Sequence, residues 1–228
     1  MKPNITEHLA EGQICCDPKW EAAYRRFETS EEEIAKFIGR LRKLEVDQLP
    51  CSSHIVELFC GRGNGLRALE RIGLSNIAGV DLSQELLLQV ESSAPLHLAD
   101  CRQLPFEDGS FDAAIVQGGL HHLPVLPGDL QKVLSEVARI LRTGGRFFVV
   151  EPWQTPFLRF VHAVTNQSLV RRLYPRGDAL AEMIELESET YFQWLSQPDK
   201  ILAEFDRHFD VRWKQIGWGK LMLIATVN

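Results

Sequence analysis

Between residues 53 and 151, short apolar runs alternate with segments of helical character, and this alternation restricts the possible folds more than any other feature. Five of the runs are candidate strands: 54–59, 77–81, 96–99, 112–117 and 147–151. Between the last two, apolar residues from Leu130 to Leu141 recur at helical spacing, and Thr143-Gly144-Gly145 is expected to end this helix. Strands that alternate with helices imply right-handed βαβ crossovers, and therefore a parallel sheet with helices on both faces.

The flanking segments depart from this pattern. Residues 1–50 are expected to form an N-terminal helical cap, in which 17–27 make one helix and Ser30 with Glu33 has the spacing of a capping box. Residues 152 to about 200 form a polar, helical insertion, and two further strands follow at 211–215 and 221–227. For residues 51–228 we predict an α/β fold: a Rossmann-like, mostly parallel seven-stranded sheet that ends in an antiparallel hairpin.

Composition excludes several classes of protein. A net charge of −6 argues against a nucleic-acid partner, which would favour a basic face. No run approaches the length needed to cross a membrane, so we expect no membrane span. The five cysteines are odd in number and show no C-x-x-C spacing, which favours a reducing cytoplasm over disulfides or a zinc knuckle. The oligomeric state stays open.

Three polar or glycine-rich segments follow the first three candidate strands. The first strand leads into Cys60-Gly61-Arg62-Gly63, where glycine permits a tight turn and close approach of a ligand to the backbone; a turn without a ligand is the alternative. The second strand ends in Asp81, where an acid can accept hydrogen bonds from ribose hydroxyls, or can cap the next helix, as can Ser83. The third ends in Asp100, which could receive the exocyclic amine of adenine.

The run from Val56 to Gly63 resembles the first motif of class I S-adenosylmethionine-dependent methyltransferases. The resemblance is greatest to the small-molecule branch that includes the ubiquinone and menaquinone C-methyltransferases. Four further segments agree in order and spacing: Gly79-Val80-Asp81-Leu82-Ser83, 99–106, 110–123 and 139–147. One departure is that Phe59 stands where the family usually has glycine, while an extra glycine, Gly65, follows the motif.

The resemblance implies S-adenosylmethionine as the cofactor and assigns its contacts. Glu57 would hold the methionine amino group, with the backbone of Gln117 nearby, and Gly61 and Gly63 would face the methionine part. A register shift would align three glycines with the family pattern but would leave Phe59 where the acid belongs, so Glu57 is retained as the acid. The complete set of predicted cofactor-binding residues is Glu57, Phe59, Gly61, Gly63, Asp81, Leu82, Asp100, Cys101 and Gln117.

Methyl transfer requires alignment of the reacting atoms and exclusion of water, and a general base only if the acceptor must lose a proton. His121 and His122 are the candidate bases, because they follow the fourth strand at the edge where ligands bind in open α/β sheets. Alternatively, one of them anchors the loop. Adjacent side chains point apart in an extended chain, so the pair is a poor chelate and we expect no metal.

We expect a small, at least partly apolar methyl acceptor, enclosed by the N-terminal helices and the 152–200 insertion, where aromatic residues gather. A group of acids in the insertion is interpreted as a solvent-facing helix: Glu182, Glu185, Glu187 and Glu189. Two other functions fit part of the sequence pattern. A nicotinamide-dependent oxidoreductase would also use the glycine loop but would leave Asp100 and the terminal hairpin unexplained. An S-adenosylmethionine-binding protein without catalysis is the second.

Overall fold

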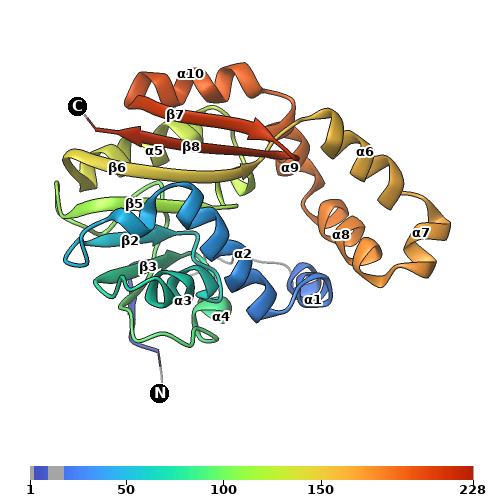
Figure 1. Cartoon of the computed structure of the whole chain (residues 1–228), viewed down its shortest axis with the longest axis horizontal. Helices are drawn as coiled ribbons and strands as arrows, with labels where there is room; N and C mark the ends of the chain where they lie inside the picture. The colour runs from blue at the N-terminus through green and yellow to red at the C-terminus, as the bar shows by residue number, and fades with distance from the viewer. Residues whose placement is uncertain (1–2, 10–17, 228) are drawn as a thin grey trace.

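The computed structural model describes residues 3–9 and 18–227, and these build an eight-stranded sheet with helices on both faces (Figure 1). The strand order is β1-β4-β3-β2-β5-β6-β8-β7. Strand β8 pairs antiparallel with β6 and β7, and all other neighbouring strands pair in parallel. The strands are β1 (Ile5–Glu7), β2 (Ile55–Leu58), β3 (Ile77–Asp81), β4 (Leu96–Leu98), β5 (Phe111–Gln117), β6 (Leu141–Pro152), β7 (Asp210–Gly217) and β8 (Lys220–Thr226). The predicted α/β class, the parallel centre and the terminal hairpin are confirmed.

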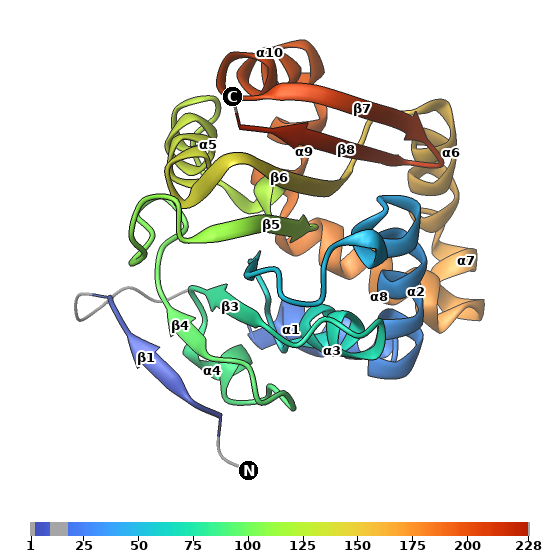
Figure 2. The same cartoon turned by 60° about the vertical axis from the view of Figure 1, so that its left-hand side comes forward.

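The predicted number of seven strands is wrong, because β1 adds an eighth. This strand lies within the segment that was expected to be wholly helical and pairs in parallel with β4, Ile5 opposite Leu96 and Glu7 opposite Leu98. Figure 2 shows it at one edge of the sheet, with β7 at the other. Its three residues are half-buried or exposed, so no apolar run marks it in the sequence.

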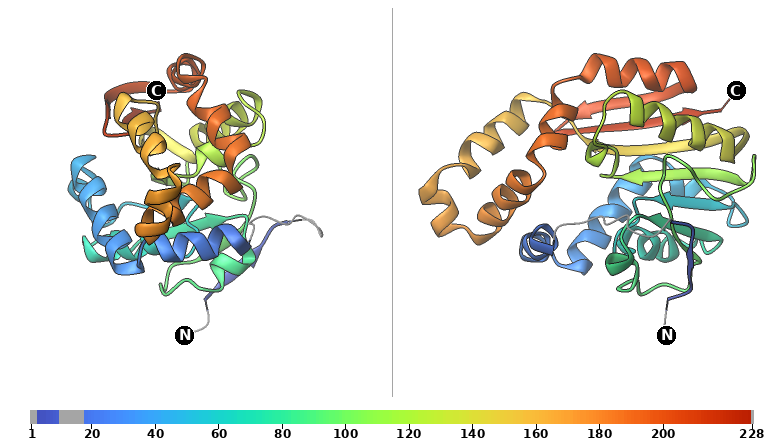
Figure 3. Two further views of the ribbon diagram at one scale, coloured as in Figure 1. Left: turned by 90° about the vertical axis from the view of Figure 1, so that its right-hand side faces the viewer. Right: turned by 180° about the vertical axis from the view of Figure 1, so that it is seen from behind.

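Helices cover the sheet in two layers. On one face, α2, α3 and α4 bury Ile34, Leu66 and Leu87 against β2, β3 and β5. On the other face lie α5 and α10, and Figure 3 shows α5 in front of the strands when the molecule is seen from behind. The helices are α1 (Pro18–Phe27), α2 (Ser30–Lys43), α3 (Asn64–Arg71), α4 (Gln84–Leu87), α5 (Gly128–Ile140), α6 (Pro156–Thr165), α7 (Ser168–Leu173), α8 (Pro175–Leu186), α9 (Ser188–Leu195) and α10 (Pro198–His208), with 3-10 turns η1 (Val46–Gln48) and η2 (Leu120–His122).

Two predicted helix ends are wrong by a few residues. The capping box of α2 is Thr29 with Glu32: the Thr29 hydroxyl accepts from the Glu32 N–H at 3.3 Å, and the Glu32 carboxylate accepts from the Thr29 N–H at 3.0 Å. Glu33, the predicted partner of Ser30, instead points inward and is buried. Helix α5 ends at Ile140, so Thr143-Gly144-Gly145 lies inside β6 and does not cap the helix.

The insertion after β6 forms α6 to α9, which extend beyond the carboxyl ends of the strands and approach α1 (Figure 1). Arg26 of α1 forms ion pairs with Glu182 and, at 3.5 Å, with Asp178 of α8. Two segments far apart in the sequence therefore close over the same edge of the sheet. Within 3–9 and 18–227, no helix is both long and apolar enough to cross a bilayer.

Candidate active site

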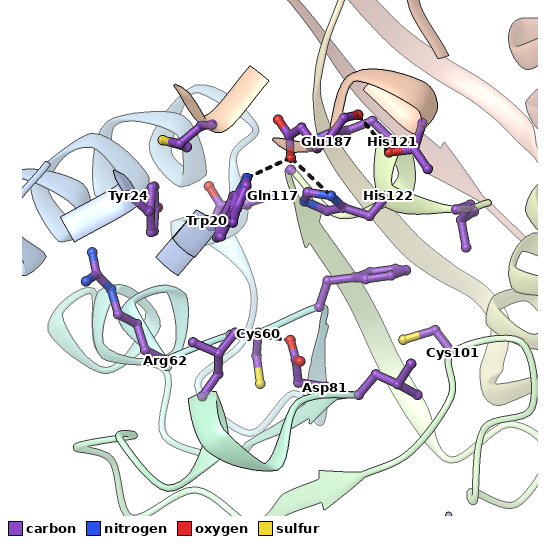
Figure 4. A pocket seen from close by; sticks show the side chains of 18 of the residues that line it. Trp20, Tyr24, Cys60, Arg62, Asp81, Cys101, Gln117, His121, His122 and Glu187 are labelled. Atoms are coloured by element: carbon purple, nitrogen blue, oxygen red, sulfur yellow. Dashed lines mark hydrogen bonds and ion pairs between the residues drawn. The ribbon is translucent and has the colours of Figure 1, made fainter. Parts of the chain in front are cut away.

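A cavity of about 740 Å³ lies at the carboxyl ends of the central strands, beneath α1, α2 and the junction of α8 with α9 (Figure 4). Most of the predicted site residues line it: Glu57, Phe59, Gly61, Asp81, Leu82, Asp100, Cys101, Gln117, His121 and His122. Gly63 does not line the cavity; it begins α3 with a left-handed backbone, at φ 78°. The structure thus brings together in one cavity residues that the sequence separates by more than sixty positions.

Glu57 and Gln117 are buried polar side chains at the bottom of the cavity. Neither the Glu57 Oε2 atom nor the amide atoms of Gln117 have a hydrogen-bond partner in the described part of the chain. Burial raises the pKa of Glu57 to about 8. Buried polar atoms that stay unpaired cost free energy, so this pair suits a ligand that donates and accepts hydrogen bonds here.

Gly65 explains how Glu57 reaches this position. A Cβ atom at Gly65 would lie 1.7 Å from the Glu57 Oε1 atom, so only glycine leaves room for the carboxyl group. The glycine that follows the motif is therefore the steric partner of the acid. This contact agrees with the choice of Glu57, rather than a shifted register, as the acid of the loop.

Phe59 occupies the position where the family usually has glycine. Its φ of 55° is left-handed, which explains the usual preference for glycine and costs an ordinary residue about 1–2 kcal/mol. Its ring lies over Gly119, where a Cβ atom would come within 2.3 Å of the Phe59 Cγ atom. Phe59 also packs against the buried core, so apolar contact offsets the backbone strain.

Asp81 connects β3 to the glycine loop. Its carboxylate accepts hydrogen bonds from the Gly61 N–H at 2.7 Å and the Ser83 N–H at 2.8 Å. Burial raises its pKa, although these N–H donors oppose the shift. The side chain that caps α4 is that of Ser83, which accepts from the Leu86 N–H, so capping does not explain why Asp81 faces the cavity.

Asp100 lies at the opposite end of the cavity floor. Arg102 grips its carboxylate, with Nη2 2.6 Å from Oδ2, and also reaches Asp129 at 3.1 Å. Burial works against ionisation, but the Arg102 contacts hold the pKa of Asp100 below its usual value. The carboxylate is thus a fixed anionic acceptor, and the neighbouring Cys101 is a buried thiol whose pKa is raised by burial.

The two histidines do not point apart, contrary to the prediction for an extended chain. They lie in η2, a 3-10 turn, and their ring centroids are 4.0 Å apart. His121 is buried, with Nδ1 2.7 Å from Oε2 of Glu151, whose Oε1 accepts from the Gly119 and Leu120 N–H groups, both at 2.8 Å. Burial lowers the pKa of His121, but the Glu151 carboxylate outweighs it and raises the pKa overall. His121 and Glu151 therefore hold the turn.

His122 faces the cavity, with 37% of its side chain exposed. Its Nδ1 atom lies 3.3 Å from Oε2 of Glu187. Enclosure by the cavity wall and the neighbouring His121 ring lower its pKa well below the usual value. The imidazole is therefore neutral near pH 7.

Glu187 is a site residue that the sequence interpretation missed. It was expected on a solvent-facing helix, but it lies at the junction of α8 and α9 with 12% of its side chain exposed. Its Oε2 atom accepts a hydrogen bond from Trp20 Nε1 at 2.9 Å, and Figure 4 shows Trp20 and His122 converging on it. Glu182 and Glu185, by contrast, form surface ion pairs with Arg26 and Arg171, as a solvated face would.

A sequence-family model described as "Methyltransferase domain" matches residues 56–149. A demethylmenaquinone methyltransferase from Corynebacterium kroppenstedtii is 29% identical over 174 residues, which cover 73% of this chain and 70% of the relative.

Solved structures share the fold. The PH0226 protein of Pyrococcus horikoshii has a TM-score of 0.66 at 19% identity and covers 93% of this chain and 100% of its own. A SAM-dependent methyltransferase from Methanosarcina mazei has a TM-score of 0.55 at 17% identity, covering 80% of this chain and 96% of its own. The segment matched by the family model contains the strands β2, β3, β4 and β5, whereas α1 and the insertion lie outside it.

Proposed function

We propose that this chain is a class I S-adenosylmethionine-dependent methyltransferase that methylates a small, partly apolar acceptor bound in the cavity beside Glu57 and His122. The observation that supports this location most directly is the unpaired, buried Glu57 and Gln117 at the cavity floor. The cofactor supplies an electrophilic methyl group on a sulfonium. The residues of the chain bind it, align the acceptor and exclude water.

We assign the cofactor contacts as follows. Glu57 and Gln117 accept hydrogen bonds from the methionine amino group, which supplies the donors that these buried oxygens lack. Asp81 accepts from the ribose hydroxyls, since each oxygen of its carboxylate has a free lone pair beyond its backbone contact. The remaining assigned residues that line the cavity surround these groups: Phe59, Gly61, Leu82, Asp100 and Cys101. The carboxylate of Asp100 and the backbone of Cys101 face the adenine.

Asp81→Ala should weaken binding of S-adenosylhomocysteine by about 1.5–3 kcal/mol, the scale of a hydrogen bond to a charged group. Titration calorimetry measures the change, and Asp47→Ala, at an exposed acid far from the cavity lining, is the control. Melting temperatures of both variants separate lost contacts from lost folding. Wild-type affinity in Asp81→Ala would remove Asp81 from the site.

Binding of S-adenosylhomocysteine at pH 7 should release about one proton from Glu57. Its pKa of about 8 in the free protein leaves the carboxyl mostly protonated at pH 7, whereas an ammonium partner favours the charged form. Affinity should therefore fall about tenfold for each pH unit below 8. Calorimetry in buffers of different ionisation enthalpy counts the protons, and Glu57→Gln should release none. A proton count of zero for the wild type would contradict the assignment.

The acceptor occupies the part of the cavity next to His122. The Trp20 ring lies edge-on to His122, with centroids 5.8 Å apart, and further apolar side chains from α2 and α8 line the cavity, among them Phe37, Met183 and Leu186. The relative from C. kroppenstedtii is named for demethylmenaquinone, and we propose a flat, ring-containing acceptor of this quinone type. Release of S-adenosylhomocysteine from a panel of quinones and phenols tests this choice. The N-terminal helices (within 1–50) and the 152–200 insertion thus form the acceptor side.

His122 is the proposed base for an acceptor that must lose a proton, and Trp20 and Glu187 position its ring. We propose that no metal takes part. The donor atoms of His121, His122 and Glu187 lie within 4.8 Å of one another, but each residue already has a protein partner. A cytoplasmic location agrees with the free thiols of Cys51, Cys60 and Cys101, and the net charge of −6 favours a small molecule over nucleic acid.

A further inference from the structure

Helix α2 presents a charged face to the cavity. Glu33, Lys36, Phe37 and Arg40 recur at helical spacing and all line it. Lys36 pairs with Glu28, while Glu33 accepts hydrogen bonds from Asn64 at 2.6 Å and Arg62 at 3.1 Å. The first two charges of this face are therefore matched by protein partners.

Arg40, the third charged residue of this face, has no such partner in the described part of the chain. Its Nε atom is buried without a hydrogen-bond partner, and no ion pair of Arg40 occurs among residues 3–9 and 18–227. The surrounding acids are Glu28, Glu33 and Glu151, and each binds another group: Lys36, Arg62 with Asn64, and His121. Burial lowers the pKa of Arg40, the sign of an enclosed and poorly compensated cation.

Positive charge accumulates around Arg40. Lys220 begins β8 opposite Pro152 of β6 and is half-buried, and burial together with Arg40, Lys36 and Lys43 lowers its pKa. The guanidinium of Arg40 also lies over the Phe37 ring, 5.4 Å from its centroid. These cations gather at the β6–β8 side of the sheet, whereas the proposed adenosine contacts Asp81 and Asp100 follow β3 and β4.

We propose that Arg40 binds an anionic oxygen of the methyl acceptor, so that the acceptor is a ring compound bearing a carboxylate or a similar acidic group. The inference rests on the proposed function and adds the charge of the substrate to it. A planar guanidinium binds a carboxylate through two parallel hydrogen bonds, and Phe37 offers the adjoining ring an apolar surface. An anion would also supply the partner that the buried Nε atom lacks.

The methionine carboxylate of the cofactor is also an anion that Arg40 could bind. The position of Arg40 decides between this carboxylate and an anionic group of the acceptor. The proposed methionine contacts, Glu57 and Gln117, lie in the last two residues of β2 and at the end of β5. Arg40 interacts with Glu28 and Glu33, and also with Glu151, near the end of β6, and Lys220 of β8; the last two lie farther from the adenosine side of the sheet. This placement favours the acceptor.

The test uses two ring compounds that differ by one carboxylate, 3-hydroxy-2-naphthoate and 2-naphthol, titrated into protein saturated with S-adenosylhomocysteine. The wild type should bind the naphthoate about tenfold or more tightly than the naphthol, as expected for hydrogen bonds to a charged group. Arg40→Met should remove this preference and change the naphthol affinity little, while Arg40→Lys keeps part of it. Arg42→Met, at an exposed position on the same helix, should behave like the wild type.

Three results would overturn the inference. The naphthoate could fail to bind the wild type, or bind Arg40→Met equally well. In the third, Arg40→Met would weaken the binding of S-adenosylhomocysteine but not the binding of 5′-methylthioadenosine, which lacks the carboxylate. The anion bound by Arg40 would then be the carboxylate of the cofactor. Because both naphthalene titrations begin with protein saturated with S-adenosylhomocysteine, a protein that does not bind it would reveal failure of the proposed function separately.

Discussion

His122→Ala should lower turnover by about a hundredfold or more and leave the affinity for S-adenosylhomocysteine nearly unchanged. His122 lines the cavity with a neutral ring whose Nδ1 atom lies 3.3 Å from Glu187, an arrangement that fixes the ring and leaves the other nitrogen for a proton of the acceptor. The measurement is kcat with any acceptor that yields S-adenosylhomocysteine, alongside calorimetric affinity for the product. The size of the effect applies to an acceptor that is deprotonated during transfer.

His121→Ala is the matched comparison. His121 is buried and hydrogen-bonded to Glu151, so its loss should lower the free energy of unfolding by about 1.5–3 kcal/mol with a smaller effect on turnover. Urea unfolding measures this change. If both variants keep near-normal turnover, neither histidine is the base. A chelator should leave the wild type active; loss of activity that a divalent metal restores would show that the histidines and Glu187 bind metal instead.

Gly119→Ala should destabilise the protein by about 1–3 kcal/mol, the usual cost of overpacking a filled site. The new Cβ atom would lie 2.3 Å from Cγ of Phe59, and the ring is held by the core beneath it. The φ of Gly119 is −127°, so the backbone itself accepts alanine and the cost is steric. Unfolding in urea gives the change in free energy.

The double variant Phe59→Gly with Gly119→Ala tests whether a clash with the Phe59 ring causes the loss of stability in Gly119→Ala. Removal of the ring should restore most of the stability lost in Gly119→Ala, so the two changes should be strongly non-additive. Gly39→Ala is the control, because a Cβ atom there meets nothing within 4 Å and alanine favours helix α2. Additive changes, or an unimpaired Gly119→Ala variant, would mean that Phe59 does not pack over Gly119.

The centre of the fold could be predicted because buried parallel strands are continuous apolar runs. The predicted strand 77–81 agrees with β3 at both ends, and the predicted 54–59 and 112–117 agree with β2 and β5 within one residue. The edge strand β1 could not be predicted, because it is short, half-exposed and held by hydrogen bonds to β4. The end of α5 was misplaced because the chain enters β6 directly at Leu141, before the glycines.

The grouping of the residues that we assign to the cofactor could also be predicted from the sequence, because the carboxyl ends of neighbouring parallel strands must meet at one edge. Asp81 follows from that rule, and Glu57 and Gln117 follow from the resemblance to the methyltransferase motifs. Trp20 and Glu187 do not, since their hydrogen bond joins positions 167 residues apart and depends on how α1 packs against the insertion. Glu187 points into the cavity because it lies at the junction of α8 and α9, and no pattern in this acidic segment predicts that junction.

Helices α1 and α8, which cover the proposed acceptor site, have a consequence for how the chain can diverge from its relatives. The two helices lie on either side of the segment that the methyltransferase family model matches, and Arg26 and Trp20 join them through Asp178, Glu182 and Glu187. If the acceptor binds where we propose, acceptor preference can change while the segment matched by the family model stays intact. Such a change requires matching residues in both α1 and the insertion. A foreign insertion after β6 would lack its ion-pair and hydrogen-bond partners in α1 and would leave the proposed acceptor site open to water.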